Sequence, residues 1–395
     1  MIDVTALVCG AELPGAGRRR SGSDSPDGVA GRKPVVVWSL TRTCNLACIR
    51  CQTDSSAVAY PDELSSAQGR ALLDDLAEFG VPMVAFSGGE PLVRRDTLDL
   101  AQYACSLGLS VTLCTNGTLL DLDTARRIRD VGVASVEISI AGIGAANDVY
   151  CGKRRAFERA LQGIHHCKAA GQCVGLRLTL TPQTLCELDA IFDFVDDLQI
   201  ERVTFAHVVA ASRGHAQADS SRHAIRQALR TIARRARQFD DRGDRRRIFT
   251  ADNDADGPFY YLMLRAQGRL DAADRAYTAL ACAGGGRSSS GVGIADIDSQ
   301  GNVHPDRHWQ SATLGNVKDR KFSEIWTDPS SELLADLRDR LPRLKGRCAA
   351  CRYLDLCGGN CRSRALAESG DMWAPDPACH LSDAQIARDA EIVLV

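Results

Sequence analysis

Short apolar segments alternate with helical segments over the first 235 residues, and this alternation constrains the fold more than any other feature. The segment PVVVWSL at 34–40 is rich in valine, as expected of a strand that is buried on both faces. Because a strand–helix–strand connection joins parallel strands, the pattern predicts an α/β fold with a six-stranded parallel sheet. The expected strands are 34–40, 82–88, 109–115, 134–140, 174–181 and 201–207, and the expected helices are 64–80, 96–107, 121–130, 155–170 and 184–198.

Several residues with ligand-binding chemistry lie at or just after the C-terminal ends of different expected strands: Cys44, Gly88, Asn116, Ser139 and His207. Six β/α units fit either a doubly wound open sheet or a barrel, but a barrel gathers such strand ends at one face. We therefore predict a partial (β/α)6 TIM-type barrel over 34–235. Six units are too few to close around a packed centre, so one side should stay open for a large substrate.

The remaining three segments have different compositions. Residues 1–33 are predicted to be a disordered N-terminal tail, because most of this stretch is rich in Gly, Ser, Arg, Asp and Pro and has no apolar period. Residues 236–281 begin with a charged, irregular run and are predicted to be a linker or bridging region. Residues 282–395 contain an expected β-hairpin at 291–306 and a cluster of cysteines, which indicates a separate metal-binding domain.

The charge balance gives no argument for two classes of partner. Lys and Arg total 48 and Asp and Glu total 50, so nothing favours a nucleic acid or an anionic membrane surface. No segment approaches the ~20 apolar residues of a membrane span. The 16 cysteines do not follow the even framework of a small secreted domain, so we expect a cytoplasmic protein whose clustered cysteines bind metal.

The first cysteine cluster is a C-x3-C-x2-C loop, TRTCNLACIRCQTDS, which contains Cys44, Cys48 and Cys51. Three thiolates can hold three irons of a [4Fe-4S] cluster and leave the fourth iron open to an outside ligand. A zinc site completed by a distant cysteine or histidine is the alternative on spacing alone.

The second cluster follows a C-x2-C-x5-C-x3-C spacing, with one more cysteine 18 residues later in DPACHL. Its members are Cys348, Cys351, Cys357, Cys361 and Cys379. This density of thiols indicates a second metal site, which could hold an iron–sulfur cluster or structural zinc.

The three-cysteine loop, together with GGEP at 88–91, TNG at 115–117 and VEISIAG at 136–142, resembles the radical S-adenosylmethionine (SAM) superfamily. The resemblance implies that the amino and carboxylate groups of SAM chelate the open iron. It also implies that reductive cleavage of SAM yields a 5′-deoxyadenosyl radical, which abstracts hydrogen from the substrate.

The resemblance implies a set of SAM-binding residues at the strand ends. Two glycines and a glutamate would hold the methionine ammonium, and an asparagine and a serine would line the SAM pocket. An arginine would bind the SAM carboxylate, unless it is an ordinary salt-bridged arginine. These candidates are Gly88, Gly89, Glu90, Asn116, Ser139 and Arg177.

The C-terminal cysteines resemble the SPASM extension of radical SAM enzymes, a domain that carries auxiliary iron–sulfur clusters. The resemblance implies one auxiliary [4Fe-4S] cluster on the ligands Cys348, Cys351, Cys357 and Cys379. A second site would use Cys361 and Cys282. Because Asp306 stands where another thiolate is expected, and a carboxylate is a harder and poorer ligand for iron, we expect that site to be partial or lost.

Later segments resemble the NirJ family, the radical SAM proteins of heme d1 biosynthesis. They are LQGIHHCKAAGQCVGLRLTLT, FAHVVAASRG, ADNDADG, GNVHPDRHWQSATLGNVKDRKFSEIWTD and GRCAACRYLDLCGGN. The resemblance implies removal of propionate side chains from a siroheme-derived iron tetrapyrrole such as 12,18-didecarboxysiroheme. It also implies an electron donor such as flavodoxin or ferredoxin.

Three residues are candidates for direct work on such a substrate. His207 ends the sixth expected strand at the barrel mouth, where it could ligate iron or donate a proton. Arg213 could pair with a substrate carboxylate. Asp148 is retained in a segment where the family has further polar residues. Each of the three candidates could instead make only local hydrogen bonds.

Other positions depart from the family pattern: Arg50, Gln52, Ala141, Asn147 and Cys151. These departures leave three alternatives open. The chain could be a peptide-modifying SPASM maturase, a siroheme decarboxylase- or deacetylase-like paralogue, or a non-enzymatic iron–sulfur scaffold with a degenerate SAM pocket.

Overall fold

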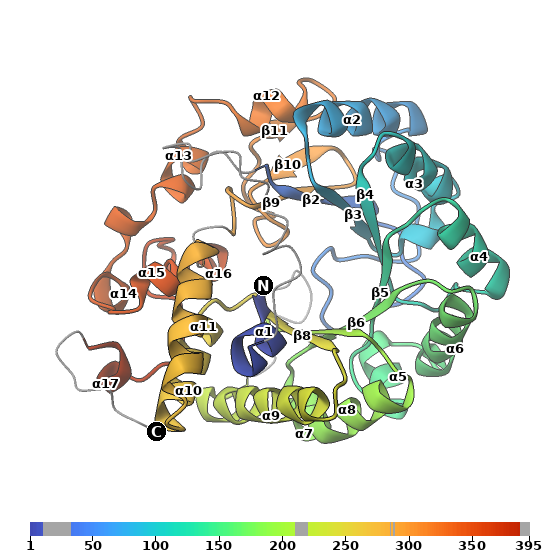
Figure 1. Ribbon diagram of the computed structural model, residues 1–395. Helices are drawn as coiled ribbons and strands as arrows, with labels where there is room; N and C mark the ends of the chain where they lie inside the picture. The colour runs from blue at the N-terminus through green and yellow to red at the C-terminus, as the bar shows by residue number, and fades with distance from the viewer. Residues whose placement is uncertain (11–32, 210–219, 285, 287–288, 388–395) are drawn as a thin grey trace.

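The computed structural model describes residues 1–10, 33–209, 220–284, 286 and 289–387, whose strands form one curved sheet. The strand order is β1-β8-β7-β6-β5-β4-β3-β2-β9-β10-β11, and β2 to β8 are parallel (Figure 1). The parallel strands are β2 Val35–Thr41, β3 Met83–Gly88, β4 Ser110–Thr115, β5 Ser135–Ser139, β6 Val174–Thr179, β7 Arg202–Ala206 and β8 Arg247–Ala251. The partial barrel is therefore confirmed, with its six predicted strands present and one more added.

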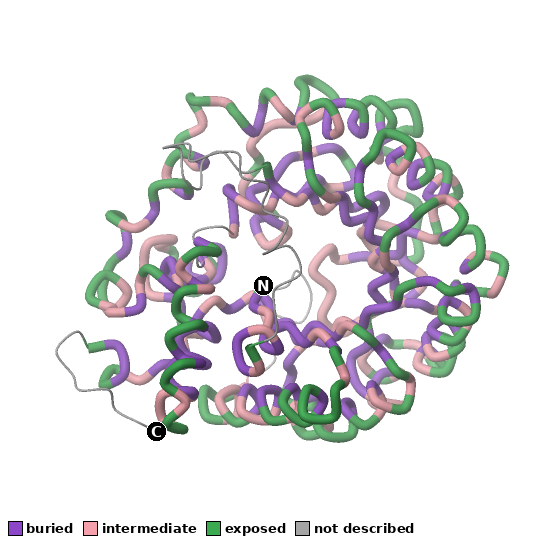
Figure 2. Tube along the Cα trace, viewed as in Figure 1, coloured by how far each residue is buried: buried purple, intermediate pink, exposed green. Residues whose placement is uncertain are grey.

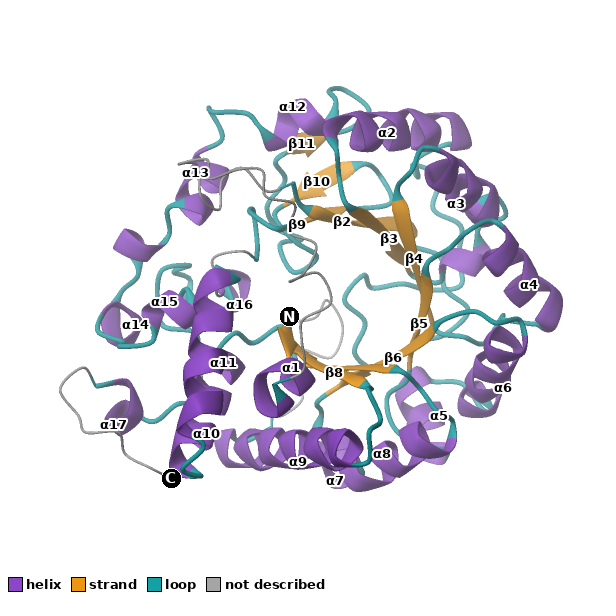
Figure 3. Cartoon of the chain, viewed as in Figure 1, coloured by secondary structure: helices purple, strands orange, loops and turns teal. Residues whose placement is uncertain are grey.

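Helices cover the outer face of this sheet (Figure 3). They are α2 Ser66–Phe79, α3 Thr97–Ser106, α4 Leu122–Asp130, α6 Ala156–Ala169, α7 Pro182–Cys186, α8 Leu188–Asp197 and α9 Arg222–Asp241. Helix α5, Ala145–Cys151, instead contacts the three-cysteine loop, where Ala47 N donates to Cys151 O at 3.0 Å. Helix α2 shows why its sequence folds this way. Ser65 and Gln68 form a capping box at its start, and Gly80, at φ +82°, takes the left-handed conformation that ends it.

The core lies between the sheet and these helices, as the buried inner segments of Figure 2 show. Trp38 of β2 is fully buried, and its ring meets Phe86 of β3 edge to face at 5.5 Å between centroids. Helix α2 comes so close to Trp38 that a Cβ at Gly69 would lie 2.8 Å from the indole. Aromatic packing and one glycine thus seat α2 against the strand that precedes the cysteine loop.

The predicted linker 236–281 is wrong over most of its length. Strand β8 lies in this segment and pairs in parallel with β7, with Ala251 opposite Ala206. Helices α10 Asp256–Ala266 and α11 Leu270–Cys282 follow it. The five-residue strand begins at the last arginine of the charged run RGDRRR, so it has no clear apolar pattern of its own and depends on pairing with its neighbours.

The predicted N-terminal tail is also wrong for its first residues. Strand β1, Ile2–Asp3, pairs antiparallel with β8, and helix α1, Val4–Cys9, packs against α9 and α11. The Asp3 carboxylate accepts a hydrogen bond from Ala6 N at 3.0 Å and so caps the helix. Eight residues are too few to show a period, so tertiary contacts decide this element; 11–32 lie outside the described residues.

The C-terminal region continues the barrel sheet. Strands β9 Ile294–Ile297 and β10 Asn302–His304 form the predicted hairpin, and β9 also pairs in parallel with β2. The other elements are β11 Gly315–Asn316, α12 Phe322–Trp326, α13 Glu332–Arg338, α14 Gly346–Ala349, α15 Leu354–Cys357, α16 Arg362–Ser369 and α17 Asp383–Ile386, with 3-10 turns at Pro91–Val93 and Leu341–Arg343. The helices α13 to α16 lie across the open side of the sheet (Figure 1). Within the described residues, no helix combines the length and apolar character that crossing a membrane requires.

Candidate functional site

The three-cysteine loop begins directly after β2 and turns its backbone toward its own sulfurs. Leu46 N donates to the sulfur of Cys44 at 3.4 Å, and Ser55 N donates to the sulfur of Cys51 at 3.3 Å. Burial raises the pKa of the Cys44 thiol to about 11, so this sulfur needs a bound metal to become a thiolate near neutral pH. Backbone donors aimed at sulfur suit an iron–sulfur cluster, whose potential depends on such hydrogen bonds.

Two glycines allow the end of β3 to touch this loop. A Cβ at Gly88, at φ +131°, would lie 2.3 Å from Thr41 O, and a Cβ at Gly89 would lie 2.4 Å from Thr43 O. The same contact is hydrogen bonded, because Gly89 N donates to Thr41 O at 2.8 Å. Glycine is therefore required here for close approach of two backbones.

Glu90 follows the two glycines and is fully buried. Its carboxylate accepts hydrogen bonds from Leu92 N at 3.0 Å, Thr115 Oγ1 at 2.8 Å and Asn116 N at 2.8 Å. Burial raises its pKa, although these three donors oppose that shift. Glu90 thus joins the ends of β3 and β4, and its contact with a methionine ammonium stays a prediction.

Asn116 links β4 to the cysteine loop. Its Nδ2 donates to Asn45 Oδ1 at 2.9 Å and lies 4.0 Å from the sulfur of Cys44, while its Oδ1 accepts from Thr118 N at 2.9 Å. Ser139, the exposed last residue of β5, stands opposite Arg177 in the sheet register. The structure therefore brings these three predicted residues to the same end of the barrel as the loop.

Arg177 is held by an acidic residue that sequence reasoning missed. Its Nη2 lies 2.8 Å from Asp252 Oδ2, just beyond β8, and Asp252 Oδ1 lies 3.5 Å from His308 Nε2. Burial opposes ionisation of Asp252, but Arg177 and His308 outweigh it and keep its pKa well below the usual range. The available signal was the acidic run ADNDADG after a short strand.

Gln52, which departs from the family pattern, makes a contact with the C-terminal region. Its Oε1 accepts from Arg307 Nε at 2.9 Å, and its Nε2 lies 3.0 Å from His308 Nδ1. Both partners lie in the segment after β10. Gln52, the residue after the last cysteine of the loop, therefore hydrogen bonds to the segment that follows the hairpin.

His207 directly follows β7, as predicted, but it is buried and does not face an open barrel mouth. His207 is 6% exposed, and its Nε2 lies 2.9 Å from Asp256 Oδ2, while His380 Nε2 lies 2.9 Å from Asp256 Oδ1. Burial opposes ionisation of Asp256, but the two histidines outweigh it and lower its pKa. Helix α10, which carries Asp256, covers His207, and a catalytic role for this histidine stays a prediction.

The other two catalytic candidates gain no support from contacts. Both oxygens of Asp148 accept backbone hydrogen bonds at the start of α6, from Arg155 N at 2.6 Å and from Phe157 N at 2.9 Å. Asp148 therefore acts as a structural cap in this arrangement. Arg213 lies outside the described residues.

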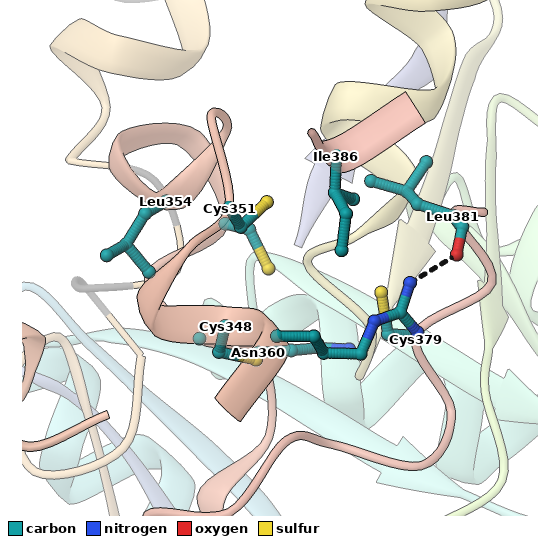
Figure 4. A pocket seen from close by; sticks show the side chains of 10 residues that line it. Cys348, Cys351, Leu354, Asn360, Cys379, Leu381 and Ile386 are labelled. Carbon is teal, nitrogen blue, oxygen red and sulfur yellow. Dashed lines mark hydrogen bonds between the residues drawn. The ribbon is translucent and has the colours of Figure 1, made fainter. Parts of the chain in front are cut away.

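The C-terminal cysteines surround one pocket. Its lining includes Cys348, Cys351, Cys357 and Cys379, and Figure 4 shows Cys351 and Cys379 on either side of it. Tyr353 N donates to the sulfur of Cys351 at 3.4 Å, as in the first loop. The four predicted ligands of one auxiliary cluster thus line the same pocket. Among the described residues, no group of three or more His, Cys, Asp or Glu side chains has the geometry to hold a single metal ion.

Cys361 and Cys282 are in different surroundings. Cys361 lies 3.2 Å from Ser363 Oγ, and burial raises its pKa to about 11, whereas Cys282 is exposed at the end of α11. Asp306 hydrogen bonds with Ser290 and accepts from His308 N at 2.7 Å. Protein hydrogen bonds hold the carboxylate that stands where a further thiolate was expected.

Comparisons with known proteins agree with this arrangement. The Radical SAM superfamily matches residues 38–195, and the SPASM iron–sulfur cluster-binding domain matches 290–352. The chain is 41% identical over 398 residues to Fe-coproporphyrin III synthase of Methanosarcina barkeri, with 98% of this chain and 99% of that protein covered. It is 43% identical over 363 residues to pre-heme d1 synthase of Dinoroseobacter shibae, with 91% and 89% covered.

A solved structure shows the same fold at low sequence identity. Streptococcus suis SuiB bound to S-adenosylmethionine superposes with a TM-score of 0.68 at 17% identity, covering 88% of this chain and 78% of that one. The overall fold is therefore shared with that protein.

Proposed function

The chain belongs to the radical SAM superfamily and carries a SPASM domain, and from this premise we propose that it removes carboxylate-bearing side chains from a siroheme-derived iron tetrapyrrole. The observation that carries the proposal is the similarity along nearly the whole chain to two tetrapyrrole synthases. The substrate we propose is 12,18-didecarboxysiroheme or a close relative, and the side chains removed are propionates.

The residues of the barrel end fit the proposed cofactors. Cys44, Cys48 and Cys51 would hold a [4Fe-4S] cluster with one open iron. SAM bound at that iron would supply, on reductive cleavage, a 5′-deoxyadenosyl radical able to take hydrogen from the substrate. The backbone around Gly88 and Gly89 holds the loop in place, and a protein's task in such chemistry is to position the cofactor and exclude side reactions.

The C-terminal pocket fits one auxiliary [4Fe-4S] cluster on Cys348, Cys351, Cys357 and Cys379. We propose that this cluster passes electrons between the barrel and an external carrier such as flavodoxin or ferredoxin. Cys361 and Cys282 are not needed for it.

A second candidate reaction is removal of acetate side chains from the same substrate. The name Fe-coproporphyrin III synthase, carried by a relative that matches 98% of this chain, favours it. The two reactions start from one tetrapyrrole and differ in which side chains leave, so the mass of the product distinguishes them.

The test is an anaerobic assay of the reconstituted enzyme with reductant, SAM and 12,18-didecarboxysiroheme. We expect 5′-deoxyadenosine together with a tetrapyrrole that has lost two propionates, and loss of both products in Cys44→Ala. Loss of acetates instead would favour the second candidate. Formation of 5′-deoxyadenosine with an unchanged tetrapyrrole, or no SAM cleavage at all, would refute the proposal.

A further inference from the structure

Two arginines act on one carboxylate, Asp252. They are Arg177, on β6, and Arg307, in the segment after β10. Burial lowers the pKa of Arg307, and the charge of Arg177 lowers it further. Burial raises the pKa of the half-buried Cys114 thiol, on β4, and both arginines oppose that shift.

The position of Arg307 is fixed beside the three-cysteine loop. Its Nε donates to Gln52 Oε1 at 2.9 Å, and its Nη2 makes a second, short hydrogen bond to the same oxygen. Gln52 immediately follows Cys51, so Arg307 is held one residue from a proposed cluster ligand. Among the described residues, no hydrogen bond engages the remaining Nη1 of Arg307.

Arg177 has a direct acidic partner, whereas Arg307 has none. Asp252 pairs with Arg177 at 2.8 Å. Among the described residues Arg307 forms no ion pair, and the preceding carboxylate, Asp306, accepts a hydrogen bond from His308 N at 2.7 Å. Arg307 is half-buried, and a guanidinium that keeps a free donor and no paired anion suits an anionic ligand.

We propose that Arg307, in the field of Arg177, binds a carboxylate side chain of the substrate, and that Gln52 positions Arg307 for this contact. The inference rests on the proposed function, because an iron tetrapyrrole of the siroheme type carries several carboxylates. Arginine presents a planar fork that matches a carboxylate, and such charge-assisted bonds are stronger than neutral ones. The contact would orient the macrocycle relative to the cluster loop.

SAM also carries a carboxylate, so the experiment measures both ligands. Holoenzyme is titrated anaerobically with 12,18-didecarboxysiroheme while the Soret band is followed, and SAM binding is measured separately by equilibrium dialysis. The variants are Arg307→Gln, which removes the charge but can still donate to Gln52, and Arg307→Lys, which keeps the charge. Arg320→Gln, at an exposed arginine paired with Asp328, is the matched control.

We expect Arg307→Gln to weaken tetrapyrrole binding about tenfold or more, with Arg307→Lys intermediate, Arg320→Gln unchanged and SAM binding unchanged in all three. Gln52→Ala should weaken tetrapyrrole binding in the same direction, which keeps the test valid if Arg307→Gln fails to fold. Normal tetrapyrrole binding by both Arg307→Gln and Gln52→Ala would overturn this inference alone. Loss of SAM binding in Arg307→Gln would assign the site to the cofactor and overturn it too. Failure of the wild-type enzyme to bind the tetrapyrrole would overturn the proposed function as well.

Discussion

Replacing Asp376 with asparagine should destabilise the junction between the barrel and the C-terminal cysteine region by about 3–5 kcal/mol, the usual cost of breaking a buried ion pair from one side. Asp376 is 1% exposed and forms a two-point pair with Arg364, with Nε to Oδ1 at 2.8 Å and Nη2 to Oδ2 at 2.7 Å. The Arg364 Nη1 also donates to Val208 O and Asp252 O at the ends of β7 and β8.

The magnitude follows from the number of donors that the carboxylate satisfies. Each oxygen of Asp376 accepts two hydrogen bonds, because Ala378 N also donates to Oδ1 and Cys361 N also donates to Oδ2, both at 2.9 Å. An asparagine amide can present oxygen to only one side. In either orientation two buried donors, one of them on a guanidinium, face an NH2 group and lose their acceptor.

The assay is anaerobic urea unfolding of the holoenzyme, followed by far-UV circular dichroism and by the absorbance of the clusters. A loss of this size should move the midpoint by roughly 0.5–1 M for a chain of this length. Removing both partners, as Arg364→Met with Asp376→Leu, should recover part of the loss because no charge is then left unpaired. The control is Glu158→Gln, in an exposed pair with Arg155 at 2.6 Å, which should leave the midpoint unchanged. If Asp376→Asn shifts the midpoint no more than Glu158→Gln does, the reasoning from burial and donor count is refuted.

Three further predictions concern the cluster loops and the barrel interior. Gly89→Ala would place a methyl group 2.4 Å from Thr43 O, so we expect the loss of most of the SAM-responsive cluster signal in electron paramagnetic resonance. A normal signal would contradict this prediction, because it would show that the two backbones can separate. Cys379→Ala should remove about four irons per chain whereas Cys361→Ala should remove none, and equal losses by iron analysis would contradict the ligand assignment. Burial raises the pKa of Asp296 to about 7, above its unfolded value, so this group stabilises the fold at low pH and the contribution is lost as pH rises from about 4 through 7. Asp296→Asn should therefore flatten the plot of unfolding free energy against pH over that range, and an unchanged slope would refute the shift.

Local patterns were enough to predict most of the barrel. The six strands and their intervening helices have either apolar runs or amphipathic periods, and signals such as the Ser65–Gln68 capping box lie within four residues of the boundary they set. Strand β8 and the β1–α1 unit lack such patterns. Strand β8 begins at the end of a charged run, and β1 has two residues, so only their pairing with each other and with β7 makes them strands.

The spacing of the cysteines indicated two metal-binding groups, and the resemblance to radical SAM and SPASM proteins implied which cysteines are ligands; that assignment stays a prediction. The surroundings of these cysteines depend on contacts between residues far apart. Gln52 meets Arg307 across 255 positions, and His207 meets Asp256 and His380 from separate elements. A hydrogen bond of this kind leaves no periodic trace in sequence, since it depends on where the sheet and its C-terminal extension bring two side chains together. The sequence by itself therefore determined the barrel strands and the thiols, whereas the tertiary structure decided which polar residues face the cluster loop and which are buried away from it.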